Sequence, residues 1–549
     1  MKTALLAGLG LVLLASPLLA QQVAPGLTLF NPNNDTTTYL VDSGGNTVHQ
    51  WDMTAFPGVS VHLDGDGTLL RTKQVPGPVT IGGWGGGVER VAFDGTVTWD
   101  FTMSNANDIQ HHEALTLPNG NVLMIVWERL NVLEAINAGR DPAMTIGTNW
   151  LPDAIVEIQP TGRTTGVEVW RWRAMDHVIQ DFDPLLPNFG VVGDHPERID
   201  INWPPGALAQ GEWMHSNGID YDAETDQIVI SVPNFNEIWV IDHSTTTAEA
   251  AGSTGGNQGR GGDLLYRWGN PQAYDRGTAA DQQLFFQHNP TFIDEGSPGA
   301  GNLLLFNNRV PGPPQHSEIF ELTRQNDASG AFPALSPGQP HGPAGPVWSY
   351  VAPNPGSFSS AFISGAQRLP NGNTLICSGA QSWIFEVTSA GAKVWEYFNT
   401  MAQTPQTLVF RATRIERTLW SNTRVFSAAS GGTLQLDLIA GSDHGGEVYF
   451  VVGSFGGTTP GLVIDGFTLP LNTADPYFNM MFNQPNSGPF GSTLGFLDPL
   501  GRGTATVTLP PAAGVPFIGK TIHHAWAAID PLTFAVTMTS NAEPVTVVP

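Results

Sequence analysis

The sequence predicts an all-β protein in which a six-bladed β-propeller is followed by a C-terminal β-sandwich. Three observations predict it: many turn-forming residues, a repeat marked by tryptophan, and a change of pattern after Trp420. The 549 residues include 63 glycines, 43 prolines and 16 tryptophans, and only 13% of them are charged. Disorder needs low hydrophobicity and high charge, and frequent Gly and Pro interrupt long helices, so many short buried strands fit best. We expect the propeller over 21–420 and the sandwich over 421–549.

The repeat consists of a strand-like segment, a turn that contains glycine, and a second strand that ends in tryptophan. Six copies occur, and they end at Trp51, Trp99, Trp170, Trp268, Trp348 and Trp395. A second hairpin follows most copies, for example around the turns Asn119-Gly120 and Asn371-Gly372. Two hairpins provide the four strands of one blade, and six blades close a ring without exposed edges. The uneven spacing indicates long insertions, including a predicted short helix over 130–140.

After Trp420 the tryptophan repeat stops. Alternating strands separated by Gly, Pro and Asn turns are predicted over 434–438, 448–452, 505–509 and 534–538. This pattern is typical of a β-sandwich. The pair His523-His524 lies in a predicted strand and is interpreted as structural. We find no catalytic constellation in this region, and we expect an accessory module that could attach the protein to a surface.

The composition and the N-terminus indicate where the protein works. The net charge of −26 would repel phosphate backbones, which excludes nucleic acid as a partner. Residues 1–20 combine Lys2, an apolar run and a break at Pro17, as in a secretory signal peptide, so we expect an exported protein, periplasmic or secreted. No other stretch reaches the roughly 20 apolar residues of a membrane span. Cys377 is the single cysteine, which excludes an internal disulfide and a cysteine zinc site.

Three histidines stand at the same position of successive repeats, at the start of the predicted inner strands. They are His112 in His111-His112-Glu113, His215 in His215-Ser-Asn217, and His288 in Gln287-His288-Asn289. Because the inner strands of a propeller line its central channel, we expect these side chains to converge on the axis. Near neutral pH an imidazole can act as nucleophile, proton shuttle or metal ligand.

Four ordered motifs, spread over residues 35–415, resemble those of the bacterial arylsulfotransferase family, whose members are exported six-bladed propellers. The motifs are His111-His-Glu with Leu117-Pro-Asn-Gly-Asn, His215-Ser-Asn-Gly-Ile-Asp-Tyr-Asp, Gly262-Asp-Leu-Leu-Tyr-Arg-Trp-Gly-Asn-Pro, and Gln287-His-Asn-Pro. The resemblance implies transfer of a sulfuryl group from an aryl sulfate ester to a phenol through a sulfohistidine. It implies no nucleotide sulfate donor, no cofactor and no metal.

The same resemblance assigns roles by motif position. His288 resembles the nucleophile, and His112 and His215 resemble the further catalytic residues. Asn217 and His111 are expected to bind the sulfuryl oxygens with them. The chemistry suits these residues, because a neutral imidazole attacks an anionic ester without the repulsion that a carboxylate would meet. Fixed N–H donors stabilise the charge that develops on the sulfuryl and leaving oxygens.

One position departs from the family pattern. The family has an arginine after the strand that follows the His-x-Asn element, and here Pro233 stands near that place. A guanidinium group is the natural clamp for a sulfate. Arg129 and Arg309 occupy comparable places in neighbouring blades, so each is a candidate to bind the sulfate. Each can instead be a surface or structural arginine.

Two other hypotheses remain open beside the arylsulfotransferase. The first is a secreted, non-catalytic propeller whose channel binds a small anionic ligand or a glycan, and Pro233 favours it. The second places a metal on the three histidines, as in a hydrolase or an oxidase, because three imidazoles can hold zinc or copper. The sequence names neither the sulfate donor nor the acceptor, since those contacts belong to the variable loops.

Overall fold

The computed structural model describes residues 23–145, 147–206, 208–401 and 408–549. The signal peptide predicted over 1–20 lies outside these residues. Strands dominate the described chain, whose α-helices are short: α1 (Val132–Asn137), α2 (Thr247–Ala250) and α3 (Pro476–Asn483). None of the helices in this part of the chain is long and apolar enough to cross a membrane. The prediction of an all-β protein is confirmed.

Residues 27–415 form six sheets of four antiparallel strands each, and the strands of every sheet run in order from the innermost to the outermost. The first sheet contains β28 (Val409–Ile415), β1 (Leu27–Pro32), β2 (Thr37–Val41) and β3 (Thr47–Asp52). The second contains β4 (Pro57–Leu63), β5 (Leu69–Gln74), β6 (Gly86–Val91) and β7 (Val97–Thr102). The third contains β8 (Asp108–Thr116), β9 (Val122–Glu128), β12 (Asp153–Gly162) and β13 (Thr165–Arg173).

The remaining three sheets follow the same order along the chain. The fourth contains β16 (Gly218–Asp222), β17 (Gln227–Val232), β18 (Glu237–Asp242) and β19 (Tyr266–Trp268). The fifth contains β20 (His288–Phe292), β21 (Leu303–Val310), β22 (His316–Leu322) and β23 (Trp348–Tyr350). The sixth contains β24 (Gly365–Arg368), β25 (Thr374–Ser378), β26 (Trp383–Val387) and β27 (Lys393–Phe398).

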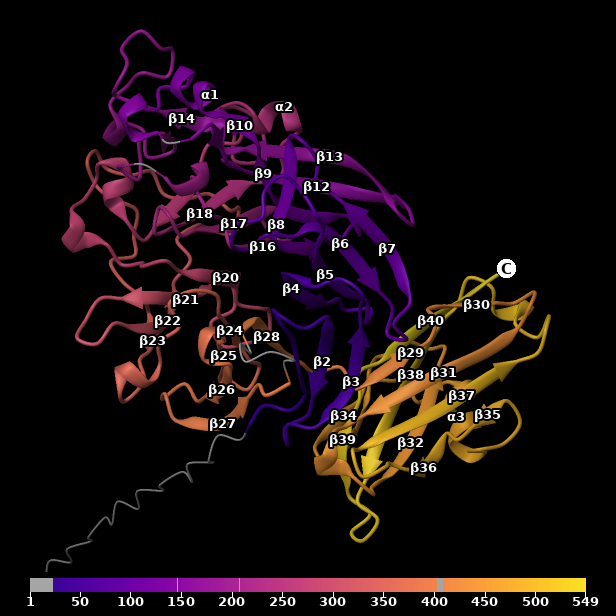
Figure 1. Cartoon of the computed structure of the whole chain (residues 1–549). Helices are drawn as coiled ribbons and strands as arrows, with labels where there is room; N and C mark the ends of the chain where they lie inside the picture. Colours follow the sequence, from indigo (N-terminus) through magenta and orange to yellow (C-terminus); the bar gives the residue numbers. More distant parts are fainter. Residues whose placement is uncertain (1–22, 146, 207, 402–407) are drawn as a thin grey trace, which may run out of the picture.

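The inner strands of these sheets form a closed ring, with the sheets spread around it (Figure 1). Strand β28 contacts β4, and contacts continue through β8, β16, β20 and β24 back to β28. The ring is closed by pairing β28, from the end of this region, with β1 from its beginning. This is the arrangement of a β-propeller, in which closure leaves no free sheet edge.

The tryptophans of the repeat lie in the outermost strands, one in each of the six sheets. Each indole N–H donates a hydrogen bond of 2.6–3.1 Å to the next sheet, either to the connection between its third and fourth strands or, for Trp99, to Thr165 at the start of the fourth strand. The bond from Trp395 to the Ser43 carbonyl joins the sixth sheet to the first. Because a buried indole N–H needs an acceptor, each tryptophan sets how two sheets meet. We call the six residues the tryptophan belt.

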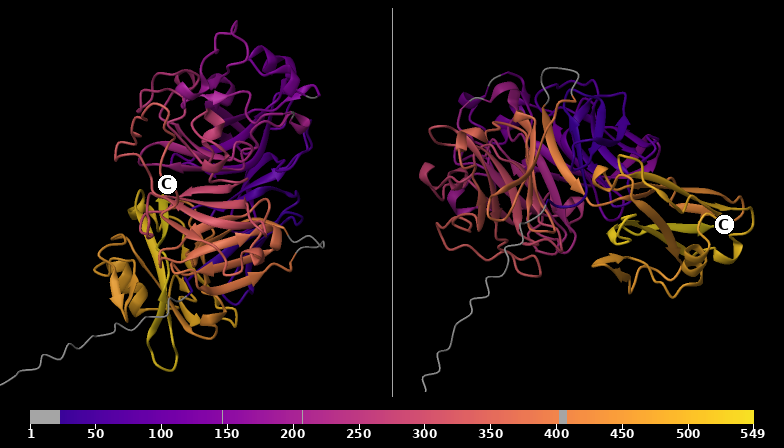
Figure 2. Two further views of the ribbon diagram at one scale, coloured as in Figure 1. Left: turned by 90° about the vertical axis from the view of Figure 1, so that its left-hand side faces the viewer. Right: turned by 90° about the horizontal axis from the view of Figure 1, so that it is seen from below.

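Residues 419–548 form two further sheets that share one hydrophobic core and lie beside the ring (Figure 2). The first sheet contains β29 (Leu419–Ser421), β31 (Gly432–Ile439), β37 (Arg502–Leu509) and β35 (Phe490–Gly491). The second contains β30 (Val425–Ser427), β40 (Glu543–Val548), β38 (Thr521–Ile529), β32 (Val448–Ser454) and β36 (Leu494–Phe496), with β39 (Val536–Thr539) paired to β38. Trp420 belongs to β29, and its ring stacks on Phe93 of the ring region at 4.5 Å.

Short elements fill the insertions between the strands. Two-stranded pairs are formed by β10 (Leu130–Asn131) with β11 (Asn149–Trp150), β14 (Val178–Ile179) with β15 (Ile199–Asp200), and β33 (Leu462–Ile464) with β34 (Phe467–Leu469). The helix predicted over 130–140 is confirmed as α1. The Asn131 side chain caps it by accepting from two backbone N–H groups. It ends before Gly139, whose φ of +97° favours glycine.

Candidate active site

The three histidines of the repeat meet in the channel, as the repeat position predicts. His112 lies in β8, His215 precedes β16, and His288 begins β20. The His112 and His215 rings lie 4.7 Å apart, centre to centre. Phe286 lies 5.9 Å from both His215 and His288, and Phe410 of β28 lies 6.2 Å from His288 and 6.1 Å from His112. We call these five side chains the histidine cluster.

The hydrogen bonds of His288 define which nitrogen can react. Its Nδ1 lies 2.8 Å from the side-chain oxygen of Asn308. The amide nitrogen of Asn308 donates to the carbonyls of Ser360 and Ile363, so its oxygen faces His288 and Nδ1 must carry the proton. Nε2 then keeps its lone pair, and it accepts the backbone N–H of Ile363 at 3.1 Å. Burial lowers the pKa of His288 to about 3, so this imidazole is neutral near pH 7.

His112 is held from behind by its neighbour. The two Nδ1 atoms of His111 and His112 lie 2.9 Å apart, so one donates to the other. His111 stacks on Trp127 at 4.0 Å, and its Nε2 lies 3.3 Å from Asp153. Burial, followed by the adjacent His215, lowers the pKa of His112 well below its usual value. His111 is therefore placed to orient His112 rather than to face the cluster itself.

His215 is the most accessible histidine of the cluster, with 16% of its side chain exposed. Its Nδ1 lies 2.5 Å from a carboxylate oxygen of Glu212, which leaves Nε2 for the cluster. The side chain of Asn217 donates to the Gln287 carbonyl at 2.9 Å. Asn217 therefore fixes the residue next to His288, and its own oxygen is buried with no partner among the described residues.

The structure brings one of the two candidate arginines to the cluster. The guanidinium of Arg309 lies 3.7 Å from the ring centre of Phe286, and its Nε donates to a backbone carbonyl at 2.7 Å. Its terminal amino groups have no protein partner in the described ranges. Its charge also contributes to lowering the pKa of His288, after burial and the charge of His215. Arg129 is exposed, and among the described residues its side chain bonds the backbone carbonyl of Ala106, which is not part of the cluster.

A glycine-rich segment over residues 82–87, which spans the end of the loop after β5 and the first two residues of β6, lies against the cluster. The Gly83 carbonyl accepts the backbone N–H of His112 at 2.8 Å. A Cβ atom on Gly83 would lie 1.9 Å from the His112 ring, and the φ of +81° also favours glycine. Glycine is therefore required for the segment to lie this close to the histidine.

A buried ion network closes the channel beneath the cluster. The carboxylate of Glu113 binds the guanidinium of Arg411 through both oxygens, one at 3.2 Å, and also lies 2.6 Å from Nε2 of His62. Burial alone would raise the pKa of Glu113, but Arg411 and His62 bring it below its usual value. Glu113 follows His112 and Arg411 follows Phe410, so this layer supports the cluster from below.

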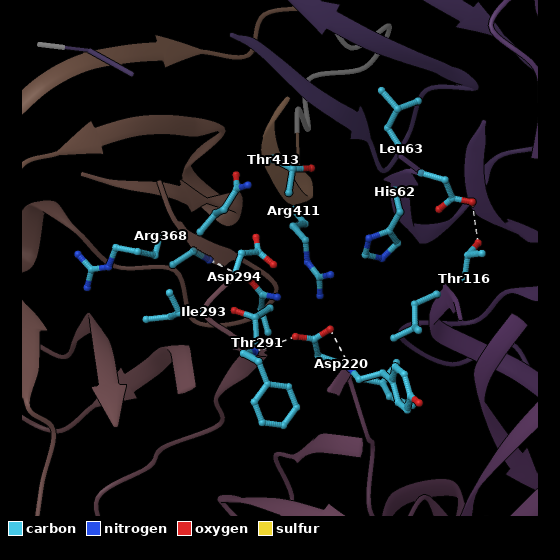
Figure 3. A pocket seen from close by; sticks show the side chains of 18 of the residues that line it. His62, Leu63, Thr116, Asp220, Thr291, Ile293, Asp294, Arg368, Arg411 and Thr413 are labelled. Atoms are coloured by element: carbon cyan, nitrogen blue, oxygen red, sulfur yellow. Dashed lines mark hydrogen bonds between the residues drawn. The ribbon is translucent and has the colours of Figure 1, made fainter. Parts of the chain in front are cut away.

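A cavity of about 360 Å³ lies on the other side of that layer (Figure 3). All six inner strands contribute to its lining, among others through His62, Thr116, Asp220, Thr291, Arg368 and Arg411. These residues define what we call the lower pocket. In Figure 3 the Arg411 side chain points into its middle, near Asp220 and Asp294. None of the site residues predicted from the sequence lines this pocket.

Sequence reasoning missed several partners of the cluster. Asn308, Phe286 and Phe410 carry no motif of their own. A signal was available for Asn308, because an asparagine pair interrupts the apolar strand that leads to Arg309. The glycine-rich segment over 82–87 was also visible in the sequence, but nothing in the sequence indicated that it packs against His112. Across the residues described, no group of three or more His, Cys, Asp or Glu is arranged to hold a metal ion, so the metal hypothesis gains no support from this geometry.

Comparison with known proteins identifies one family. The family described as Arylsulfotransferase (ASST) matches residues 18–418, whereas no curated protein matches the chain. Among solved structures, a protein of unknown function from Bacteroides caccae is 13% identical, with a TM-score of 0.39 over 72% of this chain and 100% of that one. A putative 6-phosphogluconolactonase from Bacteroides fragilis is 11% identical, with a TM-score of 0.33 over 71% and 98%. The family match spans well over half of the sequence and contains the whole histidine cluster, and the chain belongs to the arylsulfotransferase family.

Proposed function

We propose that this chain is an exported arylsulfotransferase that moves a sulfuryl group from an aryl sulfate ester to a phenol through a sulfohistidine at His288. Family membership supports the reaction class. The observation that carries the choice of nucleophile is the environment of His288. It is a buried, neutral imidazole whose Nδ1–H is held by Asn308 and whose unprotonated Nε2 accepts only a backbone N–H, that of Ile363, among the described residues.

In the first half-reaction, Nε2 of His288 attacks the sulfur and the bond from sulfur to the aryl oxygen breaks. The product is an Nε2-sulfuryl imidazolium and a phenolate. Asn308 stabilises the developing positive charge, because its oxygen accepts Nδ1–H at 2.8 Å and an amide cannot remove that proton. In the second half-reaction, the oxygen of the acceptor phenol attacks the sulfur and the Nε2–S bond breaks.

His215 is the residue that we assign to proton transfer. Its Nδ1 is paired with the Glu212 carboxylate at 2.5 Å, which orients the ring and supports a positive charge on it. Nε2 of His215 can then give a proton to the departing phenolate and take one from the incoming phenol. The proton balance is zero over both half-reactions.

The sulfuryl oxygens need donors, and three lie around His288. The backbone N–H of Ile363 now bonds Nε2, and it becomes free to donate to a sulfuryl oxygen once Nε2 is bonded to sulfur. His112, whose Nδ1 is bonded to His111, offers its Nε2 as a second donor. Arg309 supplies a positive charge, and its terminal amino groups have no protein partner among the described residues. It can therefore take the place of the arginine that the family has where this chain has Pro233.

The test uses the purified mature protein, an aryl sulfate such as 4-nitrophenyl sulfate, and phenol. We expect release of 4-nitrophenolate that depends on phenol, and a mass increase of one SO₃ group on the His288 peptide when phenol is omitted. His288→Gln should abolish both signals. His316→Gln, in β22 of the same sheet, is the matched control and should keep both. Equal turnover by His288→Gln would refute the proposed nucleophile.

A non-catalytic channel that binds a small anion or a glycan is the second candidate. The observation in its favour is enclosure: only 3% of His112 and 2% of His288 is exposed, and the glycine-rich segment over 82–87 lies against His112. Saturable binding of the aryl sulfate without phenolate release or labelled histidine would select this function.

A further inference from the structure

We propose that the lower pocket is a second binding site, for a small organic cation that also carries hydroxyl groups, of the amino-sugar or amino-alcohol class. The ion layer formed by Glu113, Arg411 and His62 separates it from the histidine cluster. Its volume of about 360 Å³ lies within the range of small-molecule sites and accommodates one sugar ring. The proposal does not depend on the reaction assigned to the cluster.

The charges that line the pocket favour a cation. Asp64, Asp220 and Asp294 are all in its lining. Both lining arginines are already neutralised by carboxylates outside the pocket: Arg411 by Glu113, and Arg368 by Glu321 at 2.6 Å. A sulfate ester would therefore meet carboxylates and no uncompensated arginine, so this pocket is not a second site for the proposed substrate.

Asp220 is the carboxylate best placed to hold an ammonium group. Its two oxygens accept the backbone N–H groups of Tyr221 at 2.9 Å and Phe292 at 2.7 Å, which fix its orientation. Burial raises the pKa of Asp220 to about 7, and burial also raises the pKa of Asp64 and Asp294. A cation bound beside Asp220 would compensate for the desolvation of its charge.

Asn289 provides an independent sign that the pocket is built for a ligand. It lines the pocket and is only 2% exposed. Its side-chain oxygen accepts the backbone N–H of Ala366 at 2.9 Å, so its amide nitrogen is oriented by that bond. This nitrogen has no protein partner in the part of the chain that the structure describes. Because the residue lines the pocket, this amide is available to donate to an oxygen of a bound ligand or of a water.

The rest of the lining fits a hydroxylated organic molecule rather than a bare metal ion. Thr291 and Thr413 add hydroxyl groups, and Phe292 adds an aromatic ring. Carboxylates, an amide, hydroxyls and an aromatic face together can bond several hydroxyl groups and cover the apolar face of a sugar. Within the described residues, the carboxylates do not form a metal-binding group.

The test measures binding of three probes of equal ring size to the mature protein by calorimetry: glucosamine, glucose and glucuronate. We expect glucosamine to bind at least tenfold more tightly than glucose, and glucuronate not to bind. Asp220→Asn and Asp294→Asn should each weaken glucosamine about tenfold, the usual effect of losing one charged partner. Asp94→Asn makes the same charge change in an exposed hairpin turn and should leave binding unchanged.

Each other outcome overturns the proposal. Glucosamine that fails to bind shows that the pocket does not take this class. Equal binding of glucose and glucosamine shows that charge does not select the ligand. Unchanged glucosamine binding by both pocket variants places the site elsewhere. Circular dichroism and urea unfolding confirm that the variants are folded, whatever reaction the histidine cluster carries out.

Discussion

His243 offers a quantitative test of how two of the sheets are held together. It follows β18 of the fourth sheet, and its Nε2 lies 3.1 Å from Glu157 of the third sheet. Its Nδ1 lies 2.7 Å from Asp226, and its ring packs at 4.6 Å against Trp170 of the tryptophan belt. Burial alone would lower the pKa of His243, but the two carboxylates raise it from 6.5 to about 9.

This shift predicts how stability depends on pH. A rise of the pKa from 6.5 to about 9 corresponds to about 3 kcal/mol of stabilisation by the protonated ring, since each unit is worth 1.36 kcal/mol. Because the pKa is raised in the folded state, the native protein holds the proton more tightly than the unfolded chain. The stabilisation is therefore complete below pH 6.5, and it is lost as the pH rises through 9.

The assay is urea unfolding followed by tryptophan fluorescence at about pH 6 and about pH 10, for the native sequence and for His243→Gln. The quantity of interest is the unfolding free energy of the native protein minus that of the variant. We expect this difference to be about 3 kcal/mol larger at about pH 6 than at about pH 10. His195→Gln is the control, because that histidine also pairs with a glutamate but is 49% exposed. A difference between native protein and His243→Gln that does not change with pH would refute the reasoning.

Three further predictions follow from single contacts. Trp395→Phe removes the N–H that bonds the Ser43 carbonyl and replaces the indole by a smaller ring, so the free energy of unfolding in urea should fall by at least about 1 kcal/mol; an unchanged midpoint would remove the belt as a source of stability. Asn308→Ala removes the closer acceptor of Nδ1 of His288 and leaves only the Phe286 carbonyl at 3.2 Å, so initial rates on an aryl sulfate should show kcat lowered about tenfold with KM nearly unchanged; a rise in KM alone would contradict this positioning role. Cys377 is buried and its pKa is raised to about 12 by burial, so mass spectrometry should find it unalkylated by iodoacetamide until the protein is unfolded; rapid labelling of the native protein would contradict its burial.

Local patterns determined much of the fold. The tryptophan of each repeat marks an outer strand because one side chain satisfies two local needs, apolar packing and an acceptor for its N–H, at every junction between sheets. The helix over 130–140 was likewise predictable from its own residues. The repeat also predicted that His112, His215 and His288 would meet, because equivalent positions of neighbouring sheets face the same axis.

The tertiary structure alone decided which groups complete the site. Arg129 and Arg309 occupy comparable places in their sheets, yet only Arg309 packs over Phe286, and no local pattern separates the two. The pair of Glu113 with Arg411 joins residues 298 positions apart, and the lower pocket takes residues from all six inner strands. Such contacts depend on how the ring closes when β28 pairs with β1, and ring closure is a property of the whole chain rather than of any segment. The sequence by itself thus determined the repeated framework and the place of His288 in it, while side-chain packing across the closed ring decided the partners of His288.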